Sequence, residues 1–169
     1  MSDRDRAFAD YFAARSGAMR GTAYLLCGDW HRAEDLVQTA FTKLYVHWNR
    51  VAHHEALDPY VRKVLIRTFI DEGRRSWWRR ERPQDTPIEQ AAAPVLTDDR
   101  LVLLAALARV PPRQRAVLVL RYWEDLSVED AAALLNCSTG TVKSQAARGL
   151  DTLRALMSPP VTADRREAP

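Results

Sequence analysis

The sequence contains one stripe of small and cationic residues with the spacing of a DNA-reading helix: Lys143, Ser144, Ala147 and Arg148. Residues three or four positions apart lie on one side of a helix, so these four side chains share a face. Cations bind phosphates and the acceptor edge of guanine, and small side chains between them let a helix enter the major groove. The stripe therefore predicts binding to duplex DNA.

The surrounding stretch predicts the two helices that such a stripe needs. Ser127 is placed to cap the first helix, with Asp130 at the position of a capping-box acid, and Ser138 is placed to cap the second. Apolar residues recur at helical spacing on the opposite faces: Val128, Ala131, Ala132 and Leu135, then Val142, Ala146, Gly149, Leu150 and Leu153. The short polar turn between the helices indicates a helix-turn-helix. Two successive amphipathic helices also occur in small helical domains that bind no DNA.

A second candidate nucleic-acid site lies between Pro59 and Arg82, in a helix expected to begin at Asp58 and Pro59. Eight basic residues outnumber three acids there: Arg62, Lys63, Arg67, Arg74, Arg75, Arg79, Arg80 and Arg82 against Asp71, Glu72 and Glu81. Trp77 and Trp78 stand within the basic run, and cations next to aromatic rings are typical of sites that bind single-stranded nucleic acid. The alternative is that both rings anchor the helix to its own core.

The helical periodicity predicts an all-α fold with two small domains. We expect residues 5–82 to form the first domain and residues 98–157 to form the second, a four-helix unit that ends in the helix-turn-helix. Residues 83–97 contain three prolines and no aromatic residue, which is typical of a flexible linker. Residues 158–169 have little to bury, so we expect a disordered tail.

Within the first domain, the most regular helical pattern lies between Trp30 and Asn49. Its apolar residues predict a core-facing stripe: Ala33, Leu36, Val37, Ala40, Phe41, Leu44, Tyr45 and Trp48. The polar residues on the other side are by themselves typical of a solvated face. Two earlier apolar segments, residues 8–12 and 19–26, predict two packed helices separated near Gly17.

The composition excludes several other classes of protein. The formal net charge of +3 is compatible with an anionic partner. The chain shows no secretory signal and no apolar run of membrane-spanning length, so we expect a cytoplasmic protein without membrane insertion. Cys27 and Cys137 have no further ligand at metal-binding spacing, and we expect no metal or cofactor. A metal hydrolase would need the 53–58 segment, where the adjacent histidines His53 and His54 point apart.

Three segments in this order resemble one family over nearly the whole chain. The segment AEDLVQTAF (33–41) resembles the polymerase-binding helix of a sigma factor's region 2, and YVRKVLIRTFIDEGRRSWWRRE (60–81) resembles its -10-element helix. The segment VPPRQRAVLVLRYWEDLS, followed by GTVKSQAARGL, resembles the region 4 helix-turn-helix. The chain thus resembles a small, extracytoplasmic-function (ECF) alternative sigma factor of bacterial RNA polymerase, in a subgroup similar to the sigma-E factors of actinobacteria.

The resemblance implies a promoter-specificity subunit and no enzyme. Its partners would be bacterial core RNA polymerase and promoter DNA, as duplex and as an opened strand, with an anti-sigma protein left open. A helix-turn-helix regulator that acts without being a polymerase subunit is the alternative. The implied contacts with the clamp coiled coil of the largest polymerase subunit are Asp35, Leu36, Gln38 and Thr39.

The DNA contacts fall into two sets. Those expected at the -35 duplex are Arg121, Thr141, Lys143, Ser144, Ala147 and Arg148. Those expected at the -10 strand are His53, His54, Lys63, Arg67, Arg74, Arg75, Trp77 and Trp78. Arg67 stands where the family usually has Asn, and Ala147 where some members have a larger side chain, so the promoter preference stays open.

Overall fold

The computed structural model describes residues 1–53, 56–79 and 98–158, apart from the side chains of residues 77–79. Every regular element in these residues is helical, as the periodicity predicts: α1 (Asp3–Cys27), α2 (Trp30–Val46), α3 (Trp48–Ala52), α4 (Leu57–Arg79), α5 (Asp98–Arg109), α6 (Pro112–Leu118), the π-helix η1 (Val119–Trp123), α7 (Val128–Leu135) and α8 (Thr139–Met157). The predicted linker, residues 83–97, and the predicted tail beyond Ser158 lie outside the described residues. No helix among the described residues is long and apolar enough to cross a membrane.

The prediction of two helices before residue 28 is wrong, because both apolar segments belong to the single helix α1. Ser2 and Asp5 form a capping box at its start, and Gly28 ends it with φ of 71°, in the left-handed region that favours glycine. Gly17 lies inside the helix. A glycine there weakens a helix by about 1 kcal/mol relative to alanine, which is too little to break a helix with caps at both ends.

The α2 helix begins after Asp29, whose carboxylate accepts a hydrogen bond from the Arg32 amide at 2.8 Å. The predicted core stripe is confirmed by burial at most of its positions: Ala33, Leu36, Val37, Ala40, Phe41 and Leu44 in α2. The helix ends at Val46, earlier than expected, so the buried Trp48 belongs to α3. Tyr45 departs from the pattern, because it is 39% exposed and its hydroxyl donates to Asp5 Oδ1 at 2.8 Å.

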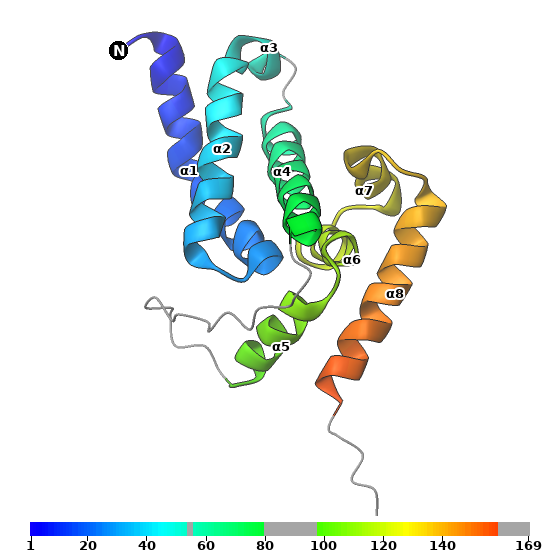
Figure 1. Cartoon of the computed structure of the whole chain (residues 1–169). Helices are drawn as coiled ribbons and strands as arrows, with labels where there is room; N and C mark the ends of the chain where they lie inside the picture. The colour runs from blue at the N-terminus through cyan, green and yellow to red at the C-terminus, as the bar shows by residue number, and fades with distance from the viewer. Residues whose placement is uncertain (54–55, 80–97, 159–169) are drawn as a thin grey trace, which may run out of the picture.

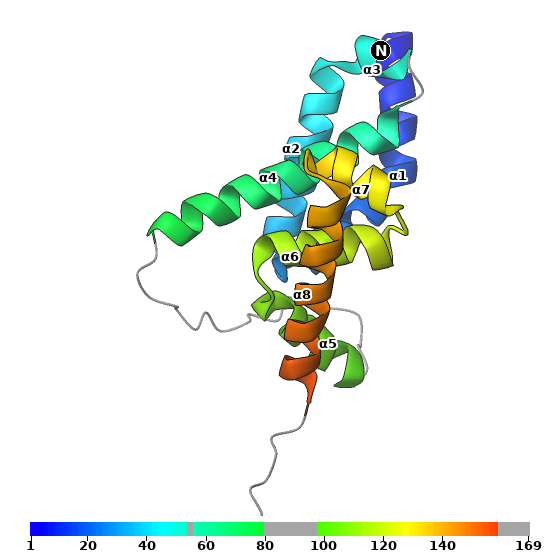
Figure 2. The ribbon, with the colours of Figure 1, turned by 90° about the vertical axis from the view of Figure 1, so that its right-hand side faces the viewer.

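The α4 helix begins at Leu57, one residue before the expected start, and Asp58 lies in its first turn. The Asp58 carboxylate accepts hydrogen bonds from the Tyr11 hydroxyl at 2.6 Å and from Arg15 Nε at 3.0 Å. Burial of Tyr11 and its hydrogen bond to Asp58 raise the pKa of the phenol. Asp58 therefore fastens the start of α4 to α1, whereas the last turns of α4 extend away from the other helices (Figure 2).

In the C-terminal half of the chain, both predicted caps are confirmed. The Ser127 hydroxyl accepts from the Asp130 amide at 3.0 Å, and the Ser138 hydroxyl accepts from the Thr141 amide at 3.0 Å. Gly149 lets α8 lie close to α6, because a Cβ at this position would lie 3.1 Å from Leu118 Cδ1. The α6 helix continues into η1, which is a π-helix rather than the expected α-helix.

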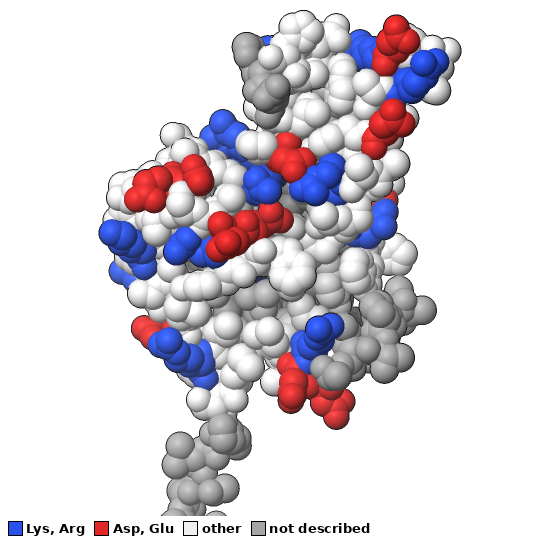
Figure 3. Space-filling view, turned by 180° about the vertical axis from the view of Figure 1, so that it is seen from behind, with Lys and Arg blue, Asp and Glu red and all other residues white. Residues whose placement is uncertain are grey.

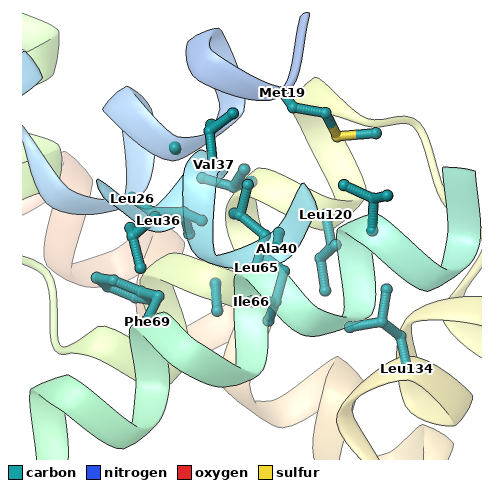
Figure 4. Packing of buried hydrophobic residues seen from close by; sticks show 14 of the residues in the cluster. Met19, Leu26, Leu36, Val37, Ala40, Leu65, Ile66, Phe69, Leu120 and Leu134 are labelled. Atoms are coloured by element: carbon teal, nitrogen blue, oxygen red, sulfur yellow. The ribbon is translucent and has the colours of Figure 1, made fainter. Parts of the chain in front are cut away.

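One apolar core joins the N-terminal helices (α1–α4) to the C-terminal helices (α5–α8). Figure 1 shows α6 and α7 beside α4, and Figure 4 shows Leu120 and Leu134 near Leu65 and Ile66 of α4. The contacts run from α1 to α5, α6 and η1, and from α4 to α6 and α7. The two halves are therefore packed against each other rather than separated.

Candidate nucleic-acid and polymerase interfaces

The predicted groove-reading stripe lies on the exposed side of α8. The side chains of Lys143, Ser144, Ala147 and Arg148 are all exposed. On the other side, Val142 is fully buried and Gly149 is buried against α6. The structure thus confirms the geometry expected from the spacing, and the contact of this stripe with DNA stays a prediction.

The turn between α7 and α8 fixes the orientation of α8 relative to α7. Asn136 ends α7 with φ of 53°, a left-handed conformation that asparagine adopts more readily than most residues. The next amide, that of Cys137, donates to the Ala132 carbonyl at 3.0 Å. These backbone bonds hold the turn in place, so the α8 stripe is presented by a rigid support.

Two other residues predicted to contact the -35 duplex are less exposed than the four residues of the α8 stripe. Arg121 is half-buried, and its NH1 group donates to the Leu126 carbonyl in the loop before α7. Thr141 is also half-buried, and its hydroxyl lies 2.9 Å from the Ser138 hydroxyl. Both residues hold the helix-turn-helix together in this structure, and their contact with the duplex stays a prediction.

A second cationic stripe runs along α4. Lys63, Arg67 and Arg74 share one side of this helix, because Arg67 lies about one turn after Lys63 and Arg74 lies about two turns after Arg67. All three side chains are exposed. From residue 63 to residue 74 the helix rises about 17 Å, roughly five nucleotide steps at the 3.4 Å spacing of a stacked strand. Arg75 is exposed next to Arg74. The stripe is long enough to follow several phosphates of one strand.

The remaining residues predicted at the -10 strand are only partly described. His53 is exposed at the end of α3, and His54 lies outside the described residues. Trp77 and Trp78 belong to the last turns of α4, and their side chains lie outside the described part of the structure. Their roles stay predictions from the sequence.

The predicted polymerase face lies on the exposed side of α2. Asp35 and Gln38 are exposed, Thr39 is half-buried, and these three line a shallow depression with Thr42 and Lys43. Leu36, which the resemblance also implies at this face, is 1% exposed and belongs to the apolar core. In this structure it supports the face from beneath, and its contact with the polymerase stays a prediction.

Arg115 is a buried residue that the sequence pattern did not single out. It is 9% exposed, and its guanidinium donates to the carbonyls of Leu26, Ala108 and Val110 at 2.5, 2.6 and 2.7 Å. Burial lowers the pKa of Arg115 to about 10, so the group remains protonated at neutral pH. No local sequence pattern marks Arg115 as buried, because the Leu26 carbonyl that it binds lies 89 residues away in the chain.

The basic side chains do not form one continuous positive patch on the surface. Figure 3 shows Lys and Arg side chains next to Asp and Glu side chains across the middle of the face seen from behind. The unbalanced cations lie instead along exposed stretches of α4 and α8. Phosphate binding by local stripes of this kind is typical of proteins that contact defined DNA elements.

Two helices with exposed cations, one of them within a helix-turn-helix, are typical of a DNA-binding protein with two domains. Comparison with known families identifies it: residues 12–79 match Sigma-70 region 2, and residues 100–153 match Sigma-70 region 4. The chain belongs to the sigma-70 family of RNA polymerase sigma factors. It is a transcription initiation factor that binds core RNA polymerase and promoter DNA, and not an enzyme.

Individual relatives support the ECF type. The chain is 38% identical over 153 residues to the RNA polymerase sigma-E factor of Streptomyces avermitilis, covering 87% of this chain and 83% of that protein. It is 27% identical over 172 residues to the ECF sigma factor SigW of Bacillus subtilis, covering 90% and 89% of the two chains. The fold is similar to that of Bartonella quintana RpoE, solved in complex with the anti-sigma factor NepR, with a TM-score of 0.73, 24% identity and coverage of 90% and 97%.

Proposed function

We propose that the two domains of this sigma factor, residues 5–82 and 98–157, read separate promoter elements while α2 holds the polymerase. The observation that carries the proposal is that α4 and α8 each present an exposed cationic stripe, and that these stripes belong to different domains. The protein acts in the cytoplasm, where the polymerase meets the chromosome.

The α8 stripe enters the major groove of the -35 duplex. Arg148 and Lys143 supply contacts to phosphates or to guanine, and Ser144 and Ala147 keep the space between them free of bulky side chains. The caps at Ser127 and the turn at Asn136 position the helix before it meets DNA. This preorganisation limits the ordering that binding requires.

The α4 stripe holds the opened -10 strand. Lys63, Arg67, Arg74 and Arg75 neutralise phosphates, and Trp77 and Trp78 offer rings on which unstacked bases can lie. A duplex needs only cations and a helix that fits its groove, whereas an opened strand also needs faces for its bases. The loop that contains His53 and His54 precedes this helix and accepts an extruded base.

The exposed side of α2 binds the polymerase through Asp35, Gln38 and Thr39. The depression that these residues line offers a carboxylate and an amide to a basic or polar partner helix. A helix-turn-helix regulator that acts without polymerase would need neither this face nor the α4 stripe. A pull-down with core polymerase separates the two functions.

The separate roles proposed for α4 and α8 are tested by measuring strand opening separately from binding to the closed promoter. Trp77→Ala and Trp78→Ala should leave closed-complex formation nearly unchanged and should weaken the open complex by about 1 to 3 kcal/mol for each stacking ring removed. Permanganate reactivity of thymines in the -10 region reports opening, and a promoter already mismatched there serves as the control. Variants that open the duplex as well as the parent would show that the rings do not hold the strand.

A further inference from the structure

Glu124 lies where the two domains meet. Its Oε2 accepts a hydrogen bond from Arg62 Nε of α4 at 2.8 Å, and its Oε1 accepts one from the Thr22 hydroxyl of α1. The side chains of Arg62 and Glu124 are only 13% and 14% exposed, and Thr22 is fully buried. One carboxylate at the end of η1 therefore joins the region 4 domain to two helices of the region 2 domain.

This contact is specific to the packed arrangement of the domains. The other ion pairs that the described residues form join residues within the region 2 helices or within α8. Because Arg62 and Glu124 are largely removed from water, either charge left without the other in the packed state would be strongly unfavourable. The pair therefore makes the packed arrangement sensitive to its two charges.

Other contacts across the same boundary include a side-chain-to-backbone hydrogen bond, a contact of Arg115 with the Phe69 ring and apolar packing. Arg115 of α6 donates to the Leu26 carbonyl near the end of α1, and a Cβ at Gly73 of α4 would lie 3.5 Å from Pro112 of α6. Leu120 of η1 packs in the core that contains Ile66 of α4. The boundary is thus a closely packed interface, and Glu124 supplies its ionic contact.

The packed arrangement is too small to occupy both promoter elements at once. The -35 and -10 elements are about 25 base pairs apart, roughly 85 Å at 3.4 Å for each step. A compact chain of 169 residues has a radius of gyration of about 15 Å and is roughly 40 Å across. The two domains must therefore separate before α8 and α4 can bind their elements on one promoter.

We propose that Glu124, with Arg62 and Thr22, forms an interdomain latch that holds the free sigma factor in a closed form unable to span a promoter. The proposal rests on the proposed function, because the need to separate follows from two domains that read two elements. Binding to core polymerase draws the domains apart and breaks the latch. The apparent affinity for polymerase then equals the affinity of the open form multiplied by the fraction of molecules that are open.

The latch is tested with single-molecule energy transfer between dyes on the two domains. The dyes are attached to cysteines introduced at two exposed positions, Ala13→Cys in α1 and Ala155→Cys in α8. The two native thiols are removed by Cys27→Ser and Cys137→Ser, so that only the introduced cysteines are labelled. Glu124→Lys places two cations at the latch, so it should raise the fraction of molecules with a long dye separation. Its apparent affinity for core polymerase should rise by the same factor as the open fraction.

Two controls separate the latch from a general charge effect. Glu129→Lys makes the same charge change at an exposed site on α7 and should leave the separation and the affinity at the parent's values. Exchange of the pair, Arg62→Glu with Glu124→Arg, should restore the closed fraction. Circular dichroism of each variant shows that both domains remain helical.

Three results would overturn the latch. These are an unchanged polymerase affinity in Glu124→Lys, equal opening in Glu129→Lys, and no return toward the closed form in the charge exchange. A polymerase complex of the parent with the short dye separation would also overturn it. Failure of the parent to support promoter-specific transcription would instead contradict the proposed function, because the closed fraction of the free protein is measured without a promoter.

Discussion

Replacement of the buried Arg115 by methionine should destabilise the protein strongly. Arginine at this position donates to the carbonyls of Leu26, Ala108 and Val110, and its guanidinium carbon lies 5.7 Å from the centre of the Phe69 ring. Methionine fills a similar volume and donates no hydrogen bond. The variant thus removes the polar contacts while keeping most of the packing.

The magnitude follows from the groups left without partners. A buried carbonyl that loses its donor costs about 1 to 3 kcal/mol, and three carbonyls are affected. Part of this loss is offset because the variant no longer has to bury a charged guanidinium. We expect a net loss of about 2 to 4 kcal/mol, which corresponds to a drop in Tm of about 5 to 15 °C in a chain of this size.

Thermal unfolding followed by circular dichroism measures the effect, with Arg113→Met as the matched control. Arg113 lies on the same helix and is exposed, so its replacement should change stability by no more than about 0.5 kcal/mol. If Arg115→Met unfolds at the same temperature as Arg113→Met, the carbonyl contacts contribute nothing and the assigned role of Arg115 is refuted.

Three further predictions concern the interfaces and α4. Arg148→Ala should weaken binding of the polymerase complex to the -35 duplex by about 5- to 150-fold in fluorescence anisotropy, and equal loss of polymerase affinity would refute this assignment. Asp35→Lys should weaken polymerase binding about tenfold or more while Tm stays near the parent's, as with the exposed control Asp10→Lys; a large drop in Tm would refute a surface role. Burial raises the pKa of Asp58, but the hydrogen bonds from Tyr11 and Arg15 outweigh burial and lower this pKa below 3.8. The ionised carboxylate therefore stabilises the fold above pH 3.8, and this stabilisation is lost as the pH falls further. The Tm values of the parent and Asp58→Asn should therefore differ at pH 7 and converge below pH 3.8, whereas parallel curves would contradict the ion pair.

Features that depend on neighbouring residues could be predicted from the sequence. The caps at Ser127 and Ser138 involve partners three residues away, and the α8 stripe follows from helical spacing alone. The core stripe of α2 follows from the same periodicity. In each case the information needed to place the side chain lies within one or two turns.

Features that depend on distant parts of the chain could not be predicted. Glu124 is 62 residues from Arg62 and 102 residues from Thr22, and no local pattern distinguishes its carboxylate from an exposed acid. The start of α4 was misplaced for a similar reason, because Asp58 has the sequence of a cap and instead binds α1.

Run-off transcription with purified core polymerase on a promoter library tests the central claim most directly. We expect core polymerase to start specifically only when this chain is added, and the selected promoters to share two elements centred near -35 and -10. Arg148→Ala should reduce selection at the -35 element while leaving the -10 element unchanged. Equal initiation with and without the chain, or selected promoters that share a single element, would contradict a sigma factor with two separate DNA-reading domains.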